Sequence, residues 1–310
     1  MMIRFLLSAF FISVASVIHA ADRKLVMIAG SASHGSLLHE FRAGSMLLQK
    51  RLEGIPGLKT VLVTNGWPTK MAEGKRVDDN AVFDGADAVF IYSDGGGNHL
   101  AVRPERLEFL RGLMKKGVSL GLAHYAVEVL AEKGGPEWKE WIGGYYENSF
   151  SCNPIWDADY PTMPVHAITR GVKPFKTKDE WYFNMRFRDG KKGVSDILVA
   201  TPSDAVRDGP YVHPKGPYPH IQADKGRPET MMWAVERPDG GRGFGFTGGH
   251  FHRNWQNDDQ RRLLLNALVW LAKLEVPAGG IDSASVSDLE IMQNLDEKKQ
   301  SAPKAAAQKK

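Results

Sequence analysis

Histidines follow several short apolar runs in this sequence, and imidazole can serve as acid, base or metal ligand. His250 and His252 come after the run 243–249, and on an extended strand two such residues would point the same way. Gly248 and Gly249 would let the backbone approach a ligand closely there. Two such imidazoles and a distant third ligand can hold zinc or a similar ion. Spacing alone would equally fit two packed or surface imidazoles.

His124 follows the run 117–123 and precedes a further apolar segment. This order is that of a nucleophile elbow, in which a sharp strand-to-helix turn lifts one side chain above a sheet. An imidazole at the elbow can transfer protons or bind a metal, but it cannot match the acyl-enzyme chemistry of Ser or Cys. A histidine packed at a strand end and hydrogen-bonded to backbone is the alternative.

Three more histidines occupy comparable places. His99 follows the glycine-rich segment 94–98, which lacks the Gly-Lys-Ser/Thr of a P-loop; GxGxxG is also absent, so we predict no nucleotide. His34 precedes an expected helix start, where free N–H groups favour electron-rich oxygen. His39 and Glu40 are expected in the first helical turn, where a solvated imidazole and a carboxylate favoured by the helix N-terminus are equally good interpretations.

These residues can meet only if the strands that carry them run parallel. Short apolar runs alternate with stripes of helical period, and the carboxyl ends of parallel strands form the ligand-binding edge of an open sheet. Six of the ten histidines are then expected at one rim. We predict an α/β fold of the flavodoxin-like kind, with a mostly parallel sheet and helices on both faces; the strands are 24–30, 60–64, 87–93, 117–123 and 243–249, and the helices 37–52, 104–116 and 257–274.

The region 134–240 differs, because proline, Trp and Tyr cluster there and regular winding stops. Strand-like pieces remain at 180–185, 196–200 and 230–236, and long loops between them are expected to fold over the end of the sheet. Carboxylates lie beside flat aromatic side chains, a pairing that suits a sugar, although each aromatic alone is better explained as core. The residues concerned are Asp179, Glu180, Trp181, Tyr182, Trp156, Tyr211 and Tyr218. Cys152 has no helix N-terminus beside it, and we do not expect it to be a nucleophile.

Composition and charge exclude other classes. The 310 residues are 43% hydrophobic and 25% charged, as in globular chains. The formal charge of +4 comes from Arg4 and five lysines at 298–310, and without these six bases 34 basic residues stand against 36 acidic ones. A nearly neutral body lacks the basic surface that nucleic-acid binding requires.

The sequence predicts that its two ends, residues 1–20 and 277–310, lie outside the folded domain. Residues 1–20 have Arg4, an apolar run and small residues before Ala21, which predicts a Sec signal peptide and a periplasmic or secreted protein. An uncleaved anchor is the alternative, but the apolar run is shorter than the roughly 20 residues that span a bilayer. We expect no stable membrane insertion after cleavage. Residues 277–310 lack apolar periodicity and predict a low-complexity, Lys-rich tail.

With these motifs, residues 24–276 resemble the ThuA-like (trehalose-utilisation) family, a branch of the class I glutamine amidotransferase-like superfamily. The segments that carry the resemblance are SASHGSLLHEF, YSDGGGNH, KKGVSLGLAHYAVEV, DEWYFNMRF, RPDGGRGFGFTGGHFHRNW and RRLLLNALVWLA. In amidotransferases the elbow holds a catalytic cysteine and a later motif supplies its histidine. His124 and His252 stand at those positions, so glutaminase activity is not expected. The resemblance implies carbohydrate catabolism, acting on glycosides or their 3-keto derivatives, in a domain spanning 21–276.

Together these features lead to an exported, metal-assisted enzyme that isomerises or cleaves a glycoside or a keto-sugar. A divalent cation would polarise the ketone while a base removes an adjacent proton. The expected metal ligands are His99, His124 and His250; the expected catalytic residues are His124, His252, Glu40 and His34; the expected substrate-binding residues are His39, Glu180, Tyr182 and Asn254.

Two alternatives stay open. A non-catalytic sugar-binding or scaffold protein on the same fold would bind glycans without turnover. A metal-independent hydrolase with a carboxylate pair is less favoured, because acidic residues are sparse at the predicted rim. The sequence leaves the oligomeric state open.

Overall fold

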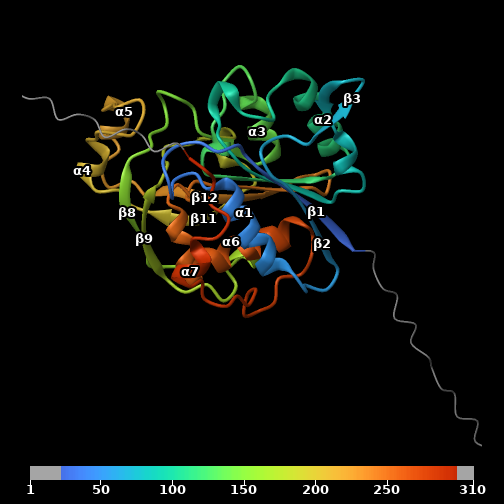
Figure 1. Ribbon diagram of the computed structural model, residues 1–310. Coiled ribbons are helices and arrows are strands. Elements are labelled where there is room, and N and C mark those ends of the chain that lie inside the picture. The colour runs from blue at the N-terminus through green and yellow to red at the C-terminus, as the bar shows by residue number, and fades with distance from the viewer. Residues whose placement is uncertain (1–21, 299–310) are drawn as a thin grey trace, which may run out of the picture.

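The computed structural model describes residues 22–298, so the predicted leader 1–20 and residues 299–310 of the predicted tail lie outside the described residues. A seven-stranded sheet crosses the middle of the molecule (Figure 1), in the order β11-β12-β13-β6-β5-β1-β2. Its strands are β1 Arg23–Ala29, β2 Leu58–Val63, β5 Ala88–Tyr92, β6 Ser119–Ala123, β11 Val194–Ala200, β12 Glu229–Glu236 and β13 Arg242–Phe246.

The pairing within the sheet confirms the mostly parallel arrangement. β1 pairs in parallel with β2 and β5, and β6 pairs in parallel with β5 and β13. Only β12 runs against its two neighbours, β11 and β13. Because β1, β5, β6 and β13 point the same way, their carboxyl ends meet at one edge of the sheet.

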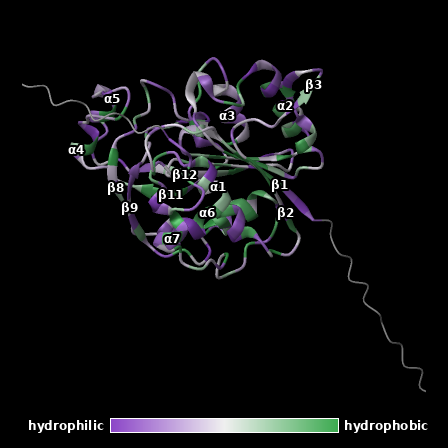
Figure 2. Cartoon of the chain, viewed as in Figure 1, coloured by the Kyte–Doolittle hydropathy of each residue, from purple (hydrophilic) through white to green (hydrophobic). Residues whose placement is uncertain are grey.

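Helices cover both faces of the sheet (Figure 1). In β1, Leu25 and Met27 belong to the core beneath α1 (Phe41–Leu52) and α6 (Asp258–Leu271). Val26 and Ile28 belong to the core beneath α2 (Pro104–Lys115) and α3 (Gly135–Trp141). Burial on both faces explains why these strands read as continuous apolar runs and not as alternating ones. Figure 2 shows the resulting hydrophobic character of the central strands and of α6.

The region 134–240 adds two antiparallel strands to the sheet and folds loops over its end. β11 and β12 confirm the strand-like pieces 196–200 and 230–236. The piece expected at 180–185 is displaced: the strand ends at Glu180, and residues 181–183 are buried, with a single isolated bridge from Phe183 to Cys152. The smaller elements are β3 Thr69–Ala72, β4 Lys75–Asp78, β7 Gly144–Tyr145, β8 Ile155–Tyr160, β9 Phe175–Glu180, β10 Arg186–Phe187, α4 Asp204–Arg207 and α5 Pro219–Gln222.

Two stretches near the sheet edge differ from expectation. Helix α1 begins at Phe41 and not at Leu37, because Leu37 and His39 have φ angles of 63° and 48°, which a right-handed helix cannot contain. Residues 277–298, expected as tail, pack on the body and include α7 (Asp288–Ile291). Their buried apolar residues are spaced five apart, which matches neither a helix nor a strand, so the sequence pattern did not predict their burial; they are Ile281, Val286 and Ile291. Among residues 22–298, no helix is both long enough and apolar enough to span a bilayer.

Candidate metal centre

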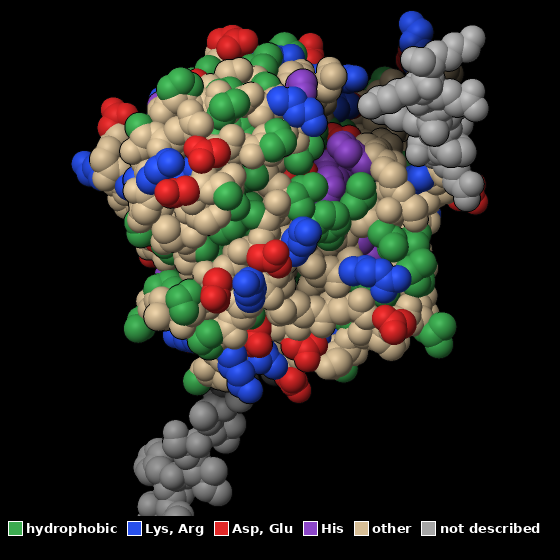
Figure 3. Space-filling view, turned by 90° about the vertical axis from the view of Figure 1, so that its left-hand side faces the viewer, with side chains coloured by type: hydrophobic (Ala, Val, Ile, Leu, Met, Phe, Trp, Pro, Cys, Tyr) green, Lys and Arg blue, Asp and Glu red, His purple; other side chains and the backbone are tan. Residues whose placement is uncertain are grey.

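The carboxyl edge of the sheet carries the candidate site. Figure 3 shows histidine side chains in a hollow of the surface. Strand β6 ends at Ala123, and His124 follows with a φ of 52° before the 3-10 turn His124–Val127. The sharp turn predicted at this position is therefore present, and it is strained for a residue with a side chain.

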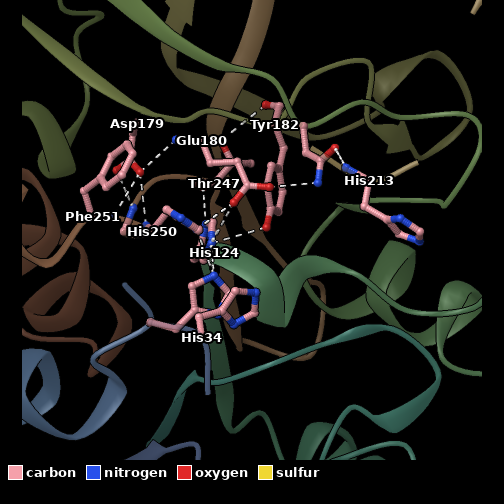
Figure 4. A network of polar contacts seen from close by, with 12 residues as sticks. His34, His124, Asp179, Glu180, Tyr182, His213, Thr247, His250 and Phe251 are labelled. Atoms are coloured by element: carbon pink, nitrogen blue, oxygen red, sulfur yellow. Dashed lines mark hydrogen bonds and ion pairs between the residues drawn. The ribbon is translucent and has the colours of Figure 1, made fainter. Parts of the chain in front are cut away.

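Four side chains from distant parts of the chain converge at this turn (Figure 4). The Nε2 atoms of His39 and His124 lie 3.0 Å apart, and Nε2 of His39 lies 2.9 Å from Nδ1 of His250. Oε2 of Glu180 lies 2.6 Å from Nδ1 of His250 and 3.8 Å from Nε2 of His124. All four residues are buried, and one ligand atom from each lies within 4.8 Å of the others. The set comes from the loop before α1, the elbow, the end of β9 and the loop after β13.

The opposite side of three of the four converging groups is held by a second partner. Nδ1 of His124 donates to the carbonyl of Thr247 at 2.9 Å, and Nδ1 of His39 lies 2.9 Å from Oδ1 of Asp94. The amide of Asn153 donates to Oε1 of Glu180 at 2.8 Å. Metal-binding histidines are typically oriented in this way, with the far nitrogen donating to a carbonyl or carboxylate.

The hydrogens of this arrangement leave lone pairs facing one another. A carbonyl only accepts, so Nδ1 of His124 carries the hydrogen and Nε2 presents a lone pair. Asp94 accepts from Ser33 and from Nδ1 of His39, which leaves a second lone pair on Nε2 of His39. Burial lowers the pKa of both imidazoles, so neither holds an extra proton between them. Two lone pairs 3.0 Å apart repel, and a cation between them would remove the repulsion.

The four atoms fit a divalent cation. Ligands about 2.0–2.1 Å from a tetrahedral ion lie about 3.4 Å from each other. The measured separations of 2.6, 2.9, 3.0 and 3.8 Å bracket this value. Three imidazoles and a carboxylate are also donors that zinc and similar ions accept. The residues present could therefore hold such an ion.

A buried carboxylate fixes the loop that carries His250. Asp179 accepts the backbone N–H groups of Gly249, His250 and Phe251 and the side-chain amide of Asn254, at 2.8 to 3.2 Å. These bonds hold residues 249–251 against the end of β9, next to Glu180. Asp179, which holds the backbone of His250, and Glu180, one of the four converging side chains, are neighbours at the end of β9. His250 and Glu180 therefore keep a fixed relative position.

The cluster opens toward His34 and Asp94, whose side chains are 42% and 39% exposed. The ring of His34 stacks on His39, with centroids 3.6 Å apart, and Oγ of Ser33 lies 3.0 Å from Nδ1 of His34. His34 and His39 both have positive φ, at 59° and 48°. Strained residues of this kind persist where the surrounding structure holds them, often at functional sites.

The sequence matches a known family. The chain matches the family described as ThuA, trehalose utilisation, over residues 44–271. The chain belongs to the ThuA family. No curated protein matches the sequence.

Solved ThuA-like proteins share the fold at low identity. One from Bacteroides uniformis is 14% identical, with a TM-score of 0.57, covering 83% of this chain and 94% of its own. Another from Parabacteroides merdae is 17% identical, with a TM-score of 0.51, covering 86% and 94%. At this identity the likeness establishes the fold alone. The mostly parallel sheet with helices on both faces is that of ThuA-like proteins.

In this ThuA chain the predicted metal ligands do not all come together. His124 and His250 belong to the cluster, but His99 lies outside it, with its ring edge-on to Trp138 and Nδ1 accepting from the N–H of Ala101. Burial lowers the pKa of His99 to about 4. His39 and Glu180, expected to bind substrate, take the remaining places. His99 is a packed imidazole because the 3-10 turn Gly96–Asn98 directs it under the loop.

His252 also points away from the cluster. Strand β13 ends at Phe246 and a 3-10 turn begins at His252, so the extended geometry that would align His250 and His252 is absent. Nε2 of His252 donates to the carbonyl of Ile291 at 2.9 Å, on the side of α7. The expectation that His252 stands opposite His124 is therefore wrong, and His250 occupies that place.

Two further predicted residues, Glu40 and Asn254, hold the surrounding backbone and side chains in place and do not face the opening. Glu40 is fully buried; its carboxylate accepts from the N–H groups of Leu37 and Asp296 and pairs with Lys298 at 3.0 Å. With both oxygens engaged, Glu40 is not free for proton transfer. Asn254 braces Asp179 and the carbonyl of Lys178. Tyr182 does face the cluster, with its hydroxyl 3.3 Å from Nε2 of His124.

The sequence predicted no role for Asp94 and Asn153, two of the residues that orient the cluster, and it suggested Asp179 only as a carboxylate suited to a sugar. Asp94 had a usable signal, because it ends the run of β5 at the same edge as His124. Asn153 had none, since it lies in a loop with no pattern.

Proposed function

We propose that this ThuA protein is a carbohydrate-active enzyme that uses a divalent metal ion held by His39, His124, His250 and Glu180. The observation that carries the proposal is the pair of facing lone pairs on His39 and His124, each with its far nitrogen already engaged. The reaction we propose is isomerisation of a keto-sugar, or elimination from a 3-keto-glycoside. The family's description as trehalose utilisation supports a sugar substrate.

The residues around the cluster favour an uncharged substrate. Within residues 22–298, no lysine or arginine forms a hydrogen bond or ion pair with any of the four side chains. The ammonium of Lys298 is engaged by Glu40 and by backbone carbonyls. A phosphorylated sugar would bring its charge toward Asp94 and Glu180 with no cationic side chain to receive it, whereas hydroxyl groups can donate to both carboxylates.

The chain's own groups can handle the proton transfers. When bound, the ion would act as a Lewis acid on a ketone oxygen, which acidifies the neighbouring C–H bond. The imidazole of His34 and the carboxylate of Asp94 lie at the opening, where each can accept a proton from substrate. Burial keeps the pKa of the Tyr182 hydroxyl well above its usual range, so this group stays a hydrogen-bond donor beside His124.

Elemental analysis of the purified mature chain tests the metal. We expect a stoichiometric divalent ion in the wild type and its loss in His39→Ala, His124→Ala and His250→Ala. His99→Gln and His220→Ala are matched controls, because these histidines lie outside the cluster. An unmetallated wild type that gains no ion on titration with zinc, manganese or iron would refute the proposal.

Turnover is tested separately, with 3-keto-glucosides and the metallated protein, by following product formation. Binding of these sugars without product would favour the sugar-binding alternative.

We also propose export to the periplasm or outside the cell, from the predicted leader at residues 1–20. Mass spectrometry of the chain expressed in a bacterial host should give an N-terminus at Ala21, and an intact N-terminus would count against it.

A further inference from the structure

A second carboxyl group lies beside the cluster. Glu128 follows the 3-10 turn of His124 and is only 8% exposed. Within residues 22–298 it forms no ion pair with a lysine, arginine or histidine, unlike the other buried glutamates, Glu40, Glu180 and Glu229. A buried carboxyl group without a cationic partner is most stable as the neutral acid.

Backbone pairing directs Glu128 toward the site. Glu128 forms a parallel bridge with Tyr146, in which the two side chains leave on the same side. The rings of Tyr146 and Tyr182 lie 5.0 Å apart, and the hydroxyl of Tyr182 is 3.3 Å from Nε2 of His124. Burial, and then the charges of Glu180 and Glu128, raise the pKa of Tyr182 well above its usual range. Glu128 is thus connected to His124 through Tyr146 and Tyr182.

The same region holds a hydroxyl that has no partner in the protein. The hydroxyl of Tyr146 is buried and makes no hydrogen bond to any described residue. On the other side, a Cβ atom on Gly96 would lie 3.4 Å from Oε1 of Glu128 and 3.3 Å from the hydroxyl of Tyr125. A neutral acid and phenol groups form a surface that suits the hydroxyl and ether oxygens of a sugar.

We infer that Glu128 is the acid of this site, positioned to protonate the oxygen that leaves the sugar. The inference rests on the elimination branch of the proposed function. In that step a base at the opening takes the proton from the carbon beside the ketone. The electron pair of the C–H bond forms the C=C bond as the C–O bond to the leaving group breaks. The leaving oxygen takes the proton of Glu128. The base then releases its proton to solvent and the carboxylate of Glu128 takes one up from solvent, so the protons balance and no oxidant or reductant is needed.

The protonation state of Glu128 agrees with this role. Burial, and then the negative charge of Glu180, raise the pKa of Glu128 to about 8, while the amide of Asn148 opposes the shift. The other titratable groups that face it are the phenols of Tyr125, Tyr146, Tyr182 and Tyr218. The group is therefore an acid at neutral pH, whereas an ordinary glutamate would already be ionised.

The test compares two 3-keto-β-glucosides that differ only in the leaving group, methanol or 4-nitrophenol. Methoxide needs a proton to leave and 4-nitrophenolate does not. We expect Glu128→Gln to lower kcat/KM for the methyl glucoside by about 10²-fold or more, the usual contribution of a general acid, and to change the nitrophenyl reaction far less. We also expect wild-type activity on the methyl substrate to fall above about pH 8, and this fall to be absent in the variant.

Glu132→Gln is the matched control, because Glu132 is exposed and lies four residues further along. Metal content and thermal unfolding of both variants establish that the site is intact. Equal losses on the two substrates, or no loss, would overturn the role of Glu128 while leaving the proposed function standing. A metallated wild type that turns over neither substrate would overturn elimination itself, and the role of Glu128 with it.

Discussion

The contact between the C-terminal segment and the His39 loop can be tested by one substitution, Lys298→Met. The ammonium of Lys298 pairs with Glu40 at 3.0 Å, and the two side chains are 5% and 0% exposed. It also donates to the carbonyls of Leu38 and His39. Methionine keeps the apolar stem of lysine but leaves the Glu40 carboxylate buried without its cation.

Removing one member of a buried ion pair typically costs about 3–5 kcal/mol. Because Glu40 keeps two backbone N–H donors, from Leu37 and Asp296, we expect the lower end, about 3 kcal/mol. With an unfolding entropy of about 2 cal/mol/K per residue, this lowers Tm by about 5 °C in a chain of this size. Calorimetry and urea titration of the mature protein at pH 7 measure both quantities.

Lys50→Met is the matched control. Lys50 also pairs with a glutamate of the C-terminal segment, Glu290, but its side chain is 57% exposed and Arg51 binds the same carboxylate. Its loss should cost about 0–1 kcal/mol. The double variant Lys298→Met with Glu40→Gln should regain part of the lost stability, because the uncompensated charge is gone. If Lys298→Met unfolds at the same temperature as Lys50→Met, the buried pair does not anchor the loop and our reasoning fails.

Three further outcomes are expected. In the metal-free protein, the raised pKa of Glu128, about 8 against an ordinary 4.5, means that its stabilising contribution is complete below about pH 4.5 and is lost as the pH rises through 8. Glu128→Gln should therefore be more stable than wild type at pH 8.5, by a few kcal/mol in urea titrations, with a smaller difference near pH 4.5. Asp94→Asn, which removes the carboxylate that orients His39, should weaken zinc binding about 10–100-fold in chelator competition, and unchanged affinity would contradict the assigned orientation. Gly95→Ala should destabilise the fold by about 2 kcal/mol or more, because the added Cβ would overlap the carbonyl oxygens of Tyr125 and Glu128. Gly112→Ala in α2 should instead stabilise the fold by about 0.5–1 kcal/mol, because its Cβ meets free space.

The sequence was sufficient to predict the sheet, because strands buried on both faces appear as short apolar runs and because their carboxyl ends share one edge. His124 and His250 were placed at this edge by their strand ends alone. The direction of a side chain just beyond a strand depends on the local backbone, and there the prediction failed. His99 and His252 follow apolar runs like the others, yet 3-10 turns direct both away from the cluster.

The fourth ligand shows a different reason for failure. Glu180 comes from β9, a strand outside the central sheet, and its place depends on how β8 and β9 pack over the edge. Neither composition nor periodicity specifies that packing. The C-terminal segment is similar, since Ile281, Val286 and Ile291 are buried at a five-residue spacing that is typical of neither helix nor strand. Contacts of this kind are set by the tertiary structure.

The cluster is held together by interactions outside it, and this has a consequence for metal binding. Facing lone pairs would drive His39 and His124 apart, but Asp94 and the carbonyl of Thr247 hold these two rings in place, and Asp179 holds the backbone of His250. Burial raises the pKa of Asp94 and Asp179, because a buried carboxylate is less stable in its charged form. A cation that binds the four side chains would remove the repulsion without moving Asp94, Thr247 or Asp179. Metal binding then raises the free energy of unfolding by an amount that grows with the logarithm of the metal concentration. Little of the binding free energy is used to rearrange the site.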